Sequence, residues 1–160
     1  MRVNYDLTGI CSSISMADRH PPCTENVGSL AEMSAVIEKV AHLMAGAGFP
    51  RRDILSVRVA LEEAIINSFK HAYRNAPNRF VTIRHAIDGR QVLLEVEDQG
   101  AGFNPDLIPD PTAPENWERE SGRGIFLMRS YMNSVRFNPC GNCVTLCKYR
   151  SDTNPAEVAD

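Results

Sequence analysis

Apolar residues recur at helical spacing directly after Ser29. Ser29 is a favourable N-cap, and Glu32 follows three residues later, which is the spacing of a capping box. Gly46 and Gly48 close the stretch, whose apolar positions are Met33, Val36, Ile37, Val40, Leu43 and Met44. The pattern predicts an amphipathic helix that starts after Ser29 and ends near Gly46.

A second helical stretch, from about residue 52 to about residue 73, is apolar on most of its circumference, so it is expected to pack on both sides. Its apolar positions are Leu55, Val57, Val59, Leu61, Ala64, Ile65, Ile66, Phe69 and Ala72. Within it, Glu63, Asn67 and His71 stand four residues apart and form one polar stripe. Taken alone, such a stripe is typical of a helix face in solvent.

The remaining regular segments alternate between apolar and polar residues, as strands do. Residues 80–87 and 91–97 are joined by Asp88-Gly89, which is a strong hairpin signal, and Val92, Leu94 and Val96 should face the core. A helical pattern covers residues 125–132. A last hairpin is predicted from residues 135–137 and 144–149.

The segments outside these elements are read as irregular. Residues 1–27 contain Pro21-Pro22 and few apolar repeats, and they are interpreted as an extension with one short strand at residues 2–7. Residues 28–150 form the predicted domain, and residues 151–160 are a polar, disordered tail. The loop from Phe103 to Glu120 has four prolines and a run of charges, so it is expected to be a mobile lid.

Composition narrows the classes of function. A chain of 160 residues with 43% hydrophobic residues can form one compact domain. Its formal charge of -3 gives no general basic footprint, which disfavours nucleic acid and acidic membranes as partners. No apolar segment is long enough for a membrane span and the start does not resemble a signal peptide, so the cytoplasm is expected.

Three of the five cysteines could suggest a metal site. Cys140, Cys143 and Cys147 read C-x-x-C-x-x-x-C, but they straddle the Gly141-Asn142 turn and run into a strand. No fourth ligand stands near them in the sequence. We therefore expect small strand residues with reduced thiols and no bound metal.

Two pairs of glycines bracket the proline-rich loop. Gly100 and Gly102 follow Asp98 at a strand end, and Gly122 and Gly124 stand just before a helix, where backbone N–H groups can hold phosphate oxygens. The first pair lacks the third glycine of a dinucleotide fingerprint. No P-loop run is present either.

The ordered set of E-x-x-x-N on a helix, D-x-G-x-G after a strand, a flexible loop and G-x-G at a helix start resembles the ATPase domain that gyrase, heat-shock protein 90, histidine kinases and the mismatch-repair ATPase share. This is the GHKL, or Bergerat, fold. The segment Leu61 to Tyr73 is most similar to the bacterial anti-sigma-factor serine kinases. The resemblance covers about residues 28–150 and implies an α+β two-layer sandwich, with a mostly antiparallel mixed sheet and helices on one face.

The resemblance also implies roles for the site residues. Glu63 would be the general base or would orient the nucleophile, with Glu62 the weaker candidate, and Asn67 would bind Mg2+. Asp98 would accept a hydrogen bond from the adenine amino group, which favours ATP over GTP. Further ATP-binding candidates are Gly100, Gly102, which would let the base approach the backbone, Gly122, Gly124, and Arg123 or Arg119 at the terminal phosphate.

The resemblance leaves the roles of two positions undecided. His71 matches a position that often holds histidine in the kinase branch, and it serves either phosphate binding or helix packing. The family often has a Gly-Thr pair in the final hairpin that helps to hold an adenine-binding water, whereas Gly141 is followed here by Asn142.

At the level of function, the resemblance implies a protein-serine kinase that silences a sigma factor and phosphorylates an anti-sigma-factor antagonist of the STAS type, with a homodimer as a compatible assembly. An alternative is a nucleotide-gated protein-binding module with little or no kinase activity. A histidine kinase would need a pair of long dimerisation helices before the domain, and a gyrase-type hydrolase would need a transducing domain after it. Neither is expected in this chain.

Overall fold

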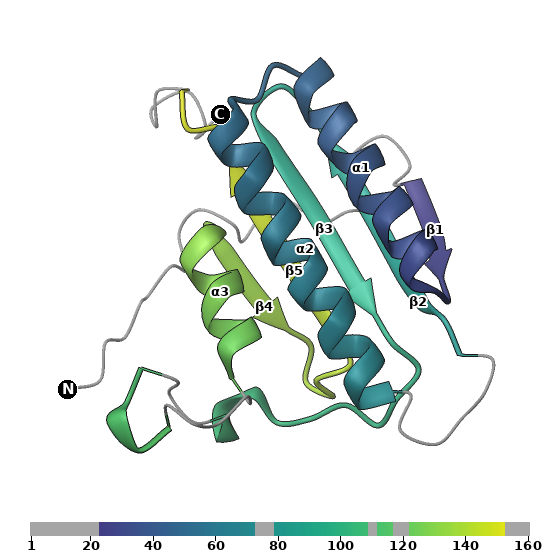
Figure 1. The fold of residues 1–160 in the computed structure, drawn as a ribbon, viewed down its shortest axis with the longest axis vertical. Helices are drawn as coiled ribbons and strands as arrows, with labels where there is room; N and C mark the ends of the chain where they lie inside the picture. Colours follow the sequence, from purple (N-terminus) through teal and green to yellow (C-terminus); the bar gives the residue numbers. More distant parts are fainter. Residues whose placement is uncertain (1–22, 73–78, 109–111, 117–121, 153–160) are drawn as a thin grey trace.

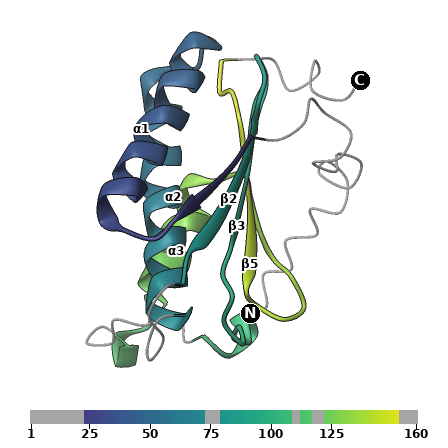
Figure 2. The same cartoon turned by 90° about the vertical axis from the view of Figure 1, so that its right-hand side faces the viewer.

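The computed structural model describes residues 23–72, 79–108, 112–116 and 122–152. These residues form two layers, a five-stranded sheet and three helices that all cover one face of it (Figures 1 and 2). The strands are β1 (Cys23–Val27), β2 (Val81–Ile87), β3 (Gln91–Glu97), β4 (Ser134–Phe137) and β5 (Cys143–Tyr149), and the helices are α1 (Leu30–Gly46), α2 (Arg51–Ala72) and α3 (Arg123–Tyr131). The α+β two-layer prediction is confirmed.

The sheet has the order β1-β2-β3-β5-β4, and every pairing between these strands is antiparallel. The predicted mixed character is therefore not found among the described strands. The turn between β2 and β3 is closed by Asp88, whose Oδ1 accepts hydrogen bonds from the backbone N–H of Arg90 and Gln91. Val92, Leu94 and Val96 on β3 are buried in the core, as their alternation predicts.

Helix α1 begins where the capping pattern places it. The Ser29 side chain accepts a hydrogen bond from the Glu32 backbone N–H at 3.2 Å, an arrangement that stabilises a helix by about 1 kcal/mol. The Glu32 carboxylate reaches back to the N–H of Gly28 at 2.7 Å, one residue earlier than in a standard capping box.

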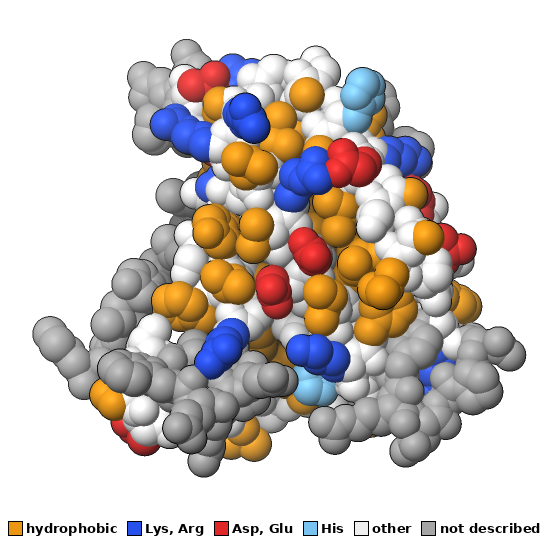
Figure 3. All heavy atoms as spheres, viewed as in Figure 1, with side chains coloured by type: hydrophobic (Ala, Val, Ile, Leu, Met, Phe, Trp, Pro, Cys, Tyr) orange, Lys and Arg blue, Asp and Glu red, His pale blue; other side chains and the backbone are white. Residues whose placement is uncertain are grey.

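Helix α2 lies between α1 and α3 and packs on both, as well as on the sheet. Val57, Leu61 and Ile65 are buried there, and Leu55 is 50% exposed. The helix-bearing face of the molecule, shown in Figure 3, therefore mixes apolar and charged side chains. The central position of α2 brings its polar stripe to the boundary with α3.

Two segments differ from the sequence interpretation. Residues 23–27 were assigned to an irregular extension, but they form the edge strand β1, which pairs with β2. An edge strand with one buried residue, Val27, carries too little alternation to be recognised. Ser151, assigned to a disordered tail, is held by Asp53 and Arg52 at the start of α2. The strand predicted at residues 2–7 lies outside the described residues, as does most of the tail.

The proline-rich loop is described in part. Two short 3-10 turns, η2 (Pro105–Leu107) and η3 (Pro114–Asn116), interrupt it. Helix α3 begins at Arg123, two residues earlier than its apolar pattern indicates, because Arg123 and Gly124 form its first turn.

Candidate functional site

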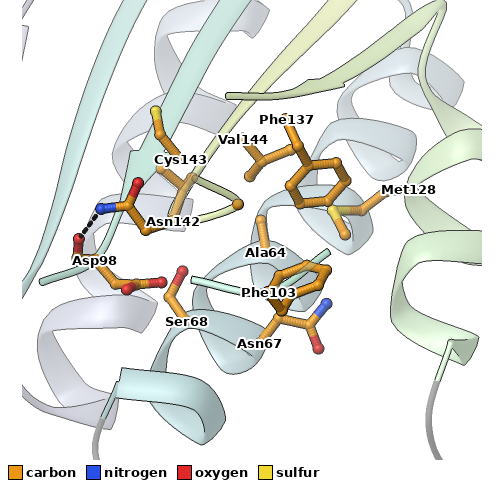
Figure 4. A pocket seen from close by; sticks show the side chains of 12 residues that line it. Ala64, Asn67, Ser68, Asp98, Phe103, Met128, Phe137, Asn142, Cys143 and Val144 are labelled. Atoms are coloured by element: carbon orange, nitrogen blue, oxygen red, sulfur yellow. Dashed lines mark hydrogen bonds between the residues drawn. The ribbon is translucent and has the colours of Figure 1, made fainter. Parts of the chain in front are cut away.

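A pocket lies between the last turns of α2, the end of β3 and the turn between β4 and β5 (Figure 4). Its cavity volume is about 10 Å³, roughly the space of one water molecule, so a larger group would enter only as the lining side chains move apart. Residues that line it are Ala64, Asn67, Ser68, Val96, Asp98, Phe103, Met128, Phe137, Gly141, Asn142, Cys143 and Val144. Sequence reasoning identified only two of these, Asn67 and Asp98, as ligand-contacting candidates.

Asp98 is a buried carboxylate at the inner end of this pocket, with 7% of its surface exposed. Its Oδ1 accepts a hydrogen bond from the Gly100 N–H at 2.7 Å. Burial raises the pKa of Asp98, and the Gly100 N–H, the nearby His71 and the Ser68 hydroxyl offset only part of that effect. A buried carboxylate kept beside a cavity in this way is typical of a binding site.

The predicted pair on α2 meets the start of α3. Gly124 has no side chain, and a Cβ added to it would lie 2.7 Å from Glu63 Oε2 and 3.0 Å from Asn67 Nδ2. The glycine therefore lets the first turn of α3 rest directly on both side chains. The structure brings Glu63, Asn67 and Gly124 together, while Glu62 is exposed and on another face of α2.

The first turn of α3 follows a glycine N-cap. This N-cap, Gly122, adopts a left-handed conformation with φ 92° and has no side chain to cap the first-turn N–H groups. Such groups, together with the helix dipole, are suited to phosphate oxygens. Arg123 is exposed in the same turn, and Arg119 lies outside the described residues.

Three aromatic rings form a wall beside the pocket. The His71 and Phe103 rings are stacked, with centroids 5.0 Å apart and an interplanar angle of 26°. Phe103 then meets Phe137 edge to face at 5.4 Å. This contact supports the packing alternative for His71, and its role toward phosphate stays a prediction.

The loop after β3 and the turn between β4 and β5 interlock through two glycines. Gly102 (φ 76°) and Gly141 (φ 73°) both adopt left-handed conformations. A Cβ on Gly102 would overlap the Cys140 carbonyl, and one on Gly141 would overlap the Phe103 carbonyl. The missing side chain of Gly102 makes room for Cys140, and the role of Gly102 toward a base stays a prediction.

No disulfide joins the four cysteines that the structure describes, and the buried Cys147 thiol donates a hydrogen bond to Gln91. Within the described ranges, no three or more His, Cys, Asp and Glu side chains gather into a group that could hold a metal ion. No helix among the described residues is both long and apolar enough to cross a membrane.

The Cys143 thiol is expected to react slowly although Cys143 lines the pocket. Burial, followed by the negative charges of Glu95 and Glu97, raises its pKa from 9.0 to about 11, against the opposing effect of Arg84. Because only the thiolate is nucleophilic, alkylation at pH 8 should be roughly 100-fold slower than for a thiol of ordinary pKa. Timed iodoacetamide labelling followed by mass spectrometry measures this, with the Cys140→Ser and Cys143→Ser variants separating the two sites. Equal rates at Cys140 and Cys143 would contradict the prediction.

Comparison with known proteins relates the chain to a described family and to named relatives. Residues 27–148 match the family described as the histidine kinase-like ATPase domain. The serine-protein kinase RsbW of Oceanobacillus iheyensis is 30% identical over 109 residues, which cover 64% of this chain and 69% of the relative. The anti-sigma F factor of Clostridium kluyveri is 36% identical over 86 residues, which cover 52% of this chain and 60% of the relative.

A solved structure shares the fold. The crystal structure of the RsbU and RsbW domains of Rv1364c from Mycobacterium tuberculosis superimposes with a TM-score of 0.54 at 16% sequence identity. The match covers 82% of this chain and 32% of that longer one. At this identity the similarity concerns the arrangement of helices and strands.

Proposed function

The chain belongs to the histidine kinase-like ATPase domain family, and from this premise we propose that it is an ATP-dependent protein-serine kinase that is also an anti-sigma factor. It binds a sigma factor and phosphorylates an anti-sigma-factor antagonist of the STAS type. The names of two relatives, a serine-protein kinase and an anti-sigma F factor, support this assignment. Partners of these kinds support a cytoplasmic location, and a homodimer is compatible with the proposal.

The observation that carries the proposal is the convergence of Glu63 and Asn67 on Gly124. A polar pair on one helix meets the glycine-containing first turn of another, and Gly124 leaves the space that a side chain would fill. A carboxylate, a neutral amide oxygen and the backbone N–H groups of a helix N-terminus are what phosphoryl transfer requires from a protein. The residues present therefore fit ATP and a magnesium ion.

The base end of the ligand is recognised by Asp98. Its carboxylate is buried beside the pocket and accepts hydrogen bonds only, so it selects a donor such as the amino group of adenine. A guanine carbonyl at the same place would face an acceptor and be rejected. Ser68, one turn before the end of α2, donates its hydroxyl to the same carboxylate, which offsets part of the rise in the Asp98 pKa that burial causes.

At the phosphate end, Asn67 would hold Mg2+ through its amide oxygen, and the first turn of α3 would hold phosphate oxygens. Bound ATP with Mg2+ supplies the phosphoryl group for transfer. Glu63 accepts the proton of the attacking serine hydroxyl or orients that hydroxyl. Its carboxylate lies next to the first turn of α3, at the positive end of that helix dipole, which supports this role.

The test is transfer of labelled phosphate to a partner. The purified chain, Mg2+ and ATP labelled in the γ position are incubated with STAS-type proteins from the same cells, and label is expected on a serine of one of them. Binding of sigma factors is measured in parallel with and without that partner. If ATP changes partner affinity while no phosphate reaches any of these proteins, the kinase assignment is wrong and the nucleotide-gated binding module takes its place.

A further inference from the structure

The turn between β4 and β5 holds Asp98 through one residue, Asn142. The Asp98 backbone N–H donates to the Asn142 carbonyl at 2.9 Å. The Asn142 side-chain Nδ2 donates to the Asp98 carbonyl at 3.2 Å, the hydrogen bond that Figure 4 marks. Both backbone polar groups of the buried aspartate are therefore paired with the same asparagine.

Asn142 is itself fixed by a second asparagine, Asn138. The Asn138 Nδ2 donates to Asn142 Oδ1 at 2.7 Å. The Asn138 Oδ1 accepts from the backbone N–H of Asn142 at 3.0 Å and of Cys143 at 3.2 Å. Because Asn142 Oδ1 is occupied by a donor, its amino group must face the Asp98 carbonyl. One orientation of the amide is thus selected.

The surrounding backbone cannot adjust easily. Gly102 and Gly141 place the loop after β3 and the turn before β5 in direct backbone contact. The Asp98 carboxylate is held separately, by the Gly100 N–H at 2.7 Å. The main chain and the side chain of Asp98 are therefore each fixed by a different neighbour.

We propose that Asn138 and Asn142 act as a clamp that positions Asp98 and thereby sets the selectivity of the pocket for a 6-aminopurine. This inference rests on the proposed function, since it assumes that the pocket receives the base of ATP. Asn142 contacts the main chain of Asp98, and Asn138 holds Asn142, so both asparagines are positioning residues. The carboxylate extends from the same Cα as the clamped backbone groups, so its direction depends on the clamp together with the Gly100 N–H.

The experiment compares ATP with inosine triphosphate, whose base carries a 6-oxo group in place of the 6-amino group. Calorimetry on the full chain with Mg2+ measures both affinities. The Asn142→Ala variant leaves the Asp98 carbonyl without its donor, and the preference for ATP over inosine triphosphate is expected to fall about tenfold. If Asn142 had a purely structural role, the affinities for both nucleotides would fall equally and their ratio would stay unchanged.

A second variant tests the same device without changing Asn142. In Asn138→Asp the acceptors for the N–H groups of Asn142 and Cys143 are kept, but the donor to Asn142 Oδ1 is lost. The Asn142 amide should then turn over and present its oxygen to the Asp98 carbonyl, which lowers the same preference. This variant also keeps the proposal testable if Asn142→Ala does not fold.

The matched control is Asn26→Ala. Asn26 lies on the edge strand β1, its side chain accepts a hydrogen bond from the Thr82 hydroxyl at 3.0 Å, and it is not among the residues that line the pocket. In this variant the preference for ATP over inosine triphosphate should equal that of the wild type. An unchanged preference in Asn142→Ala or Asn138→Asp, with wild type selective for ATP, overturns the clamp alone. Wild type that binds no ATP overturns the proposed function and the clamp together.

Discussion

Replacing Glu63 by glutamine is expected to reduce phosphoryl transfer by roughly two to four powers of ten, the usual contribution of a general base or orienting acceptor. ATP binding should be kept or become slightly tighter, because the change removes a negative charge near the phosphates and preserves the size of the side chain. The contact with Gly124 is retained for the same reason. Single-turnover phosphorylation of the antagonist, with calorimetry for ATP, measures both effects.

Glu62→Gln is the matched control for this variant. Glu62 is the adjacent carboxylate on α2, it is exposed, and it lies on a different face of the helix. Replacing the Glu62 carboxylate should leave the rate of phosphoryl transfer within a factor of about two of the wild-type rate. Transfer by Glu63→Gln at the wild-type rate would remove Glu63 from the mechanism while leaving the fold assignment intact.

Replacing Asp98 by asparagine is expected to weaken ATP binding by roughly 10- to 100-fold, the value of a hydrogen bond to a charged group in a buried site. The amide cannot simply offer its oxygen to adenine, because the Gly100 N–H already requires an acceptor at that side chain. The new amino group then faces the adenine amino group, and two donors repel. Calorimetric titration of ATP into the variant tests this result.

The same substitution should not destabilise the protein. Burial raises the pKa of Asp98, so the stability that this carboxyl group contributes is present below its unfolded pKa and is lost as pH rises through the raised folded pKa. At neutral pH, removing the charge is therefore expected to leave the melting temperature unchanged or raise it. Asp106→Asn, at an exposed aspartate in the 3-10 turn η2, serves as the control. Unchanged ATP affinity in Asp98→Asn would exclude Asp98 from the site.

Local signals predicted most of the fold. The Ser29 cap, the long apolar pattern of α2 and the Asp88-Gly89 turn each depend on residues close in the sequence, and all three appear in the structure. The position of Glu63 and Asn67 on one face of a helix follows from spacing alone. Spacing alone does not predict that these two side chains meet Gly124. That contact is expected only because the family resemblance relates the motif on α2 to the glycines before α3.

The parts that sequence reasoning missed depend on contacts between distant segments. Asn142 and Phe103 reach the pocket because the loop after β3 and the turn before β5 meet in space, and no periodicity predicts that meeting. The contact of Gly102 with Cys140 likewise has no local signature in the sequence. Strand β1 was missed because an edge strand buries little.

The contact between Gly102 and Gly141 also limits how this chain can vary. At each position a larger residue would overlap backbone atoms of the other loop and would also be strained by the positive φ. Because the obstacle is main chain, no exchange of a neighbouring side chain can make room, so neither substitution has a compensating partner in the other loop. Second-site suppressors of changes at these glycines would have to act by global stabilisation, and redesign of the nucleotide pocket has to leave both positions as they are.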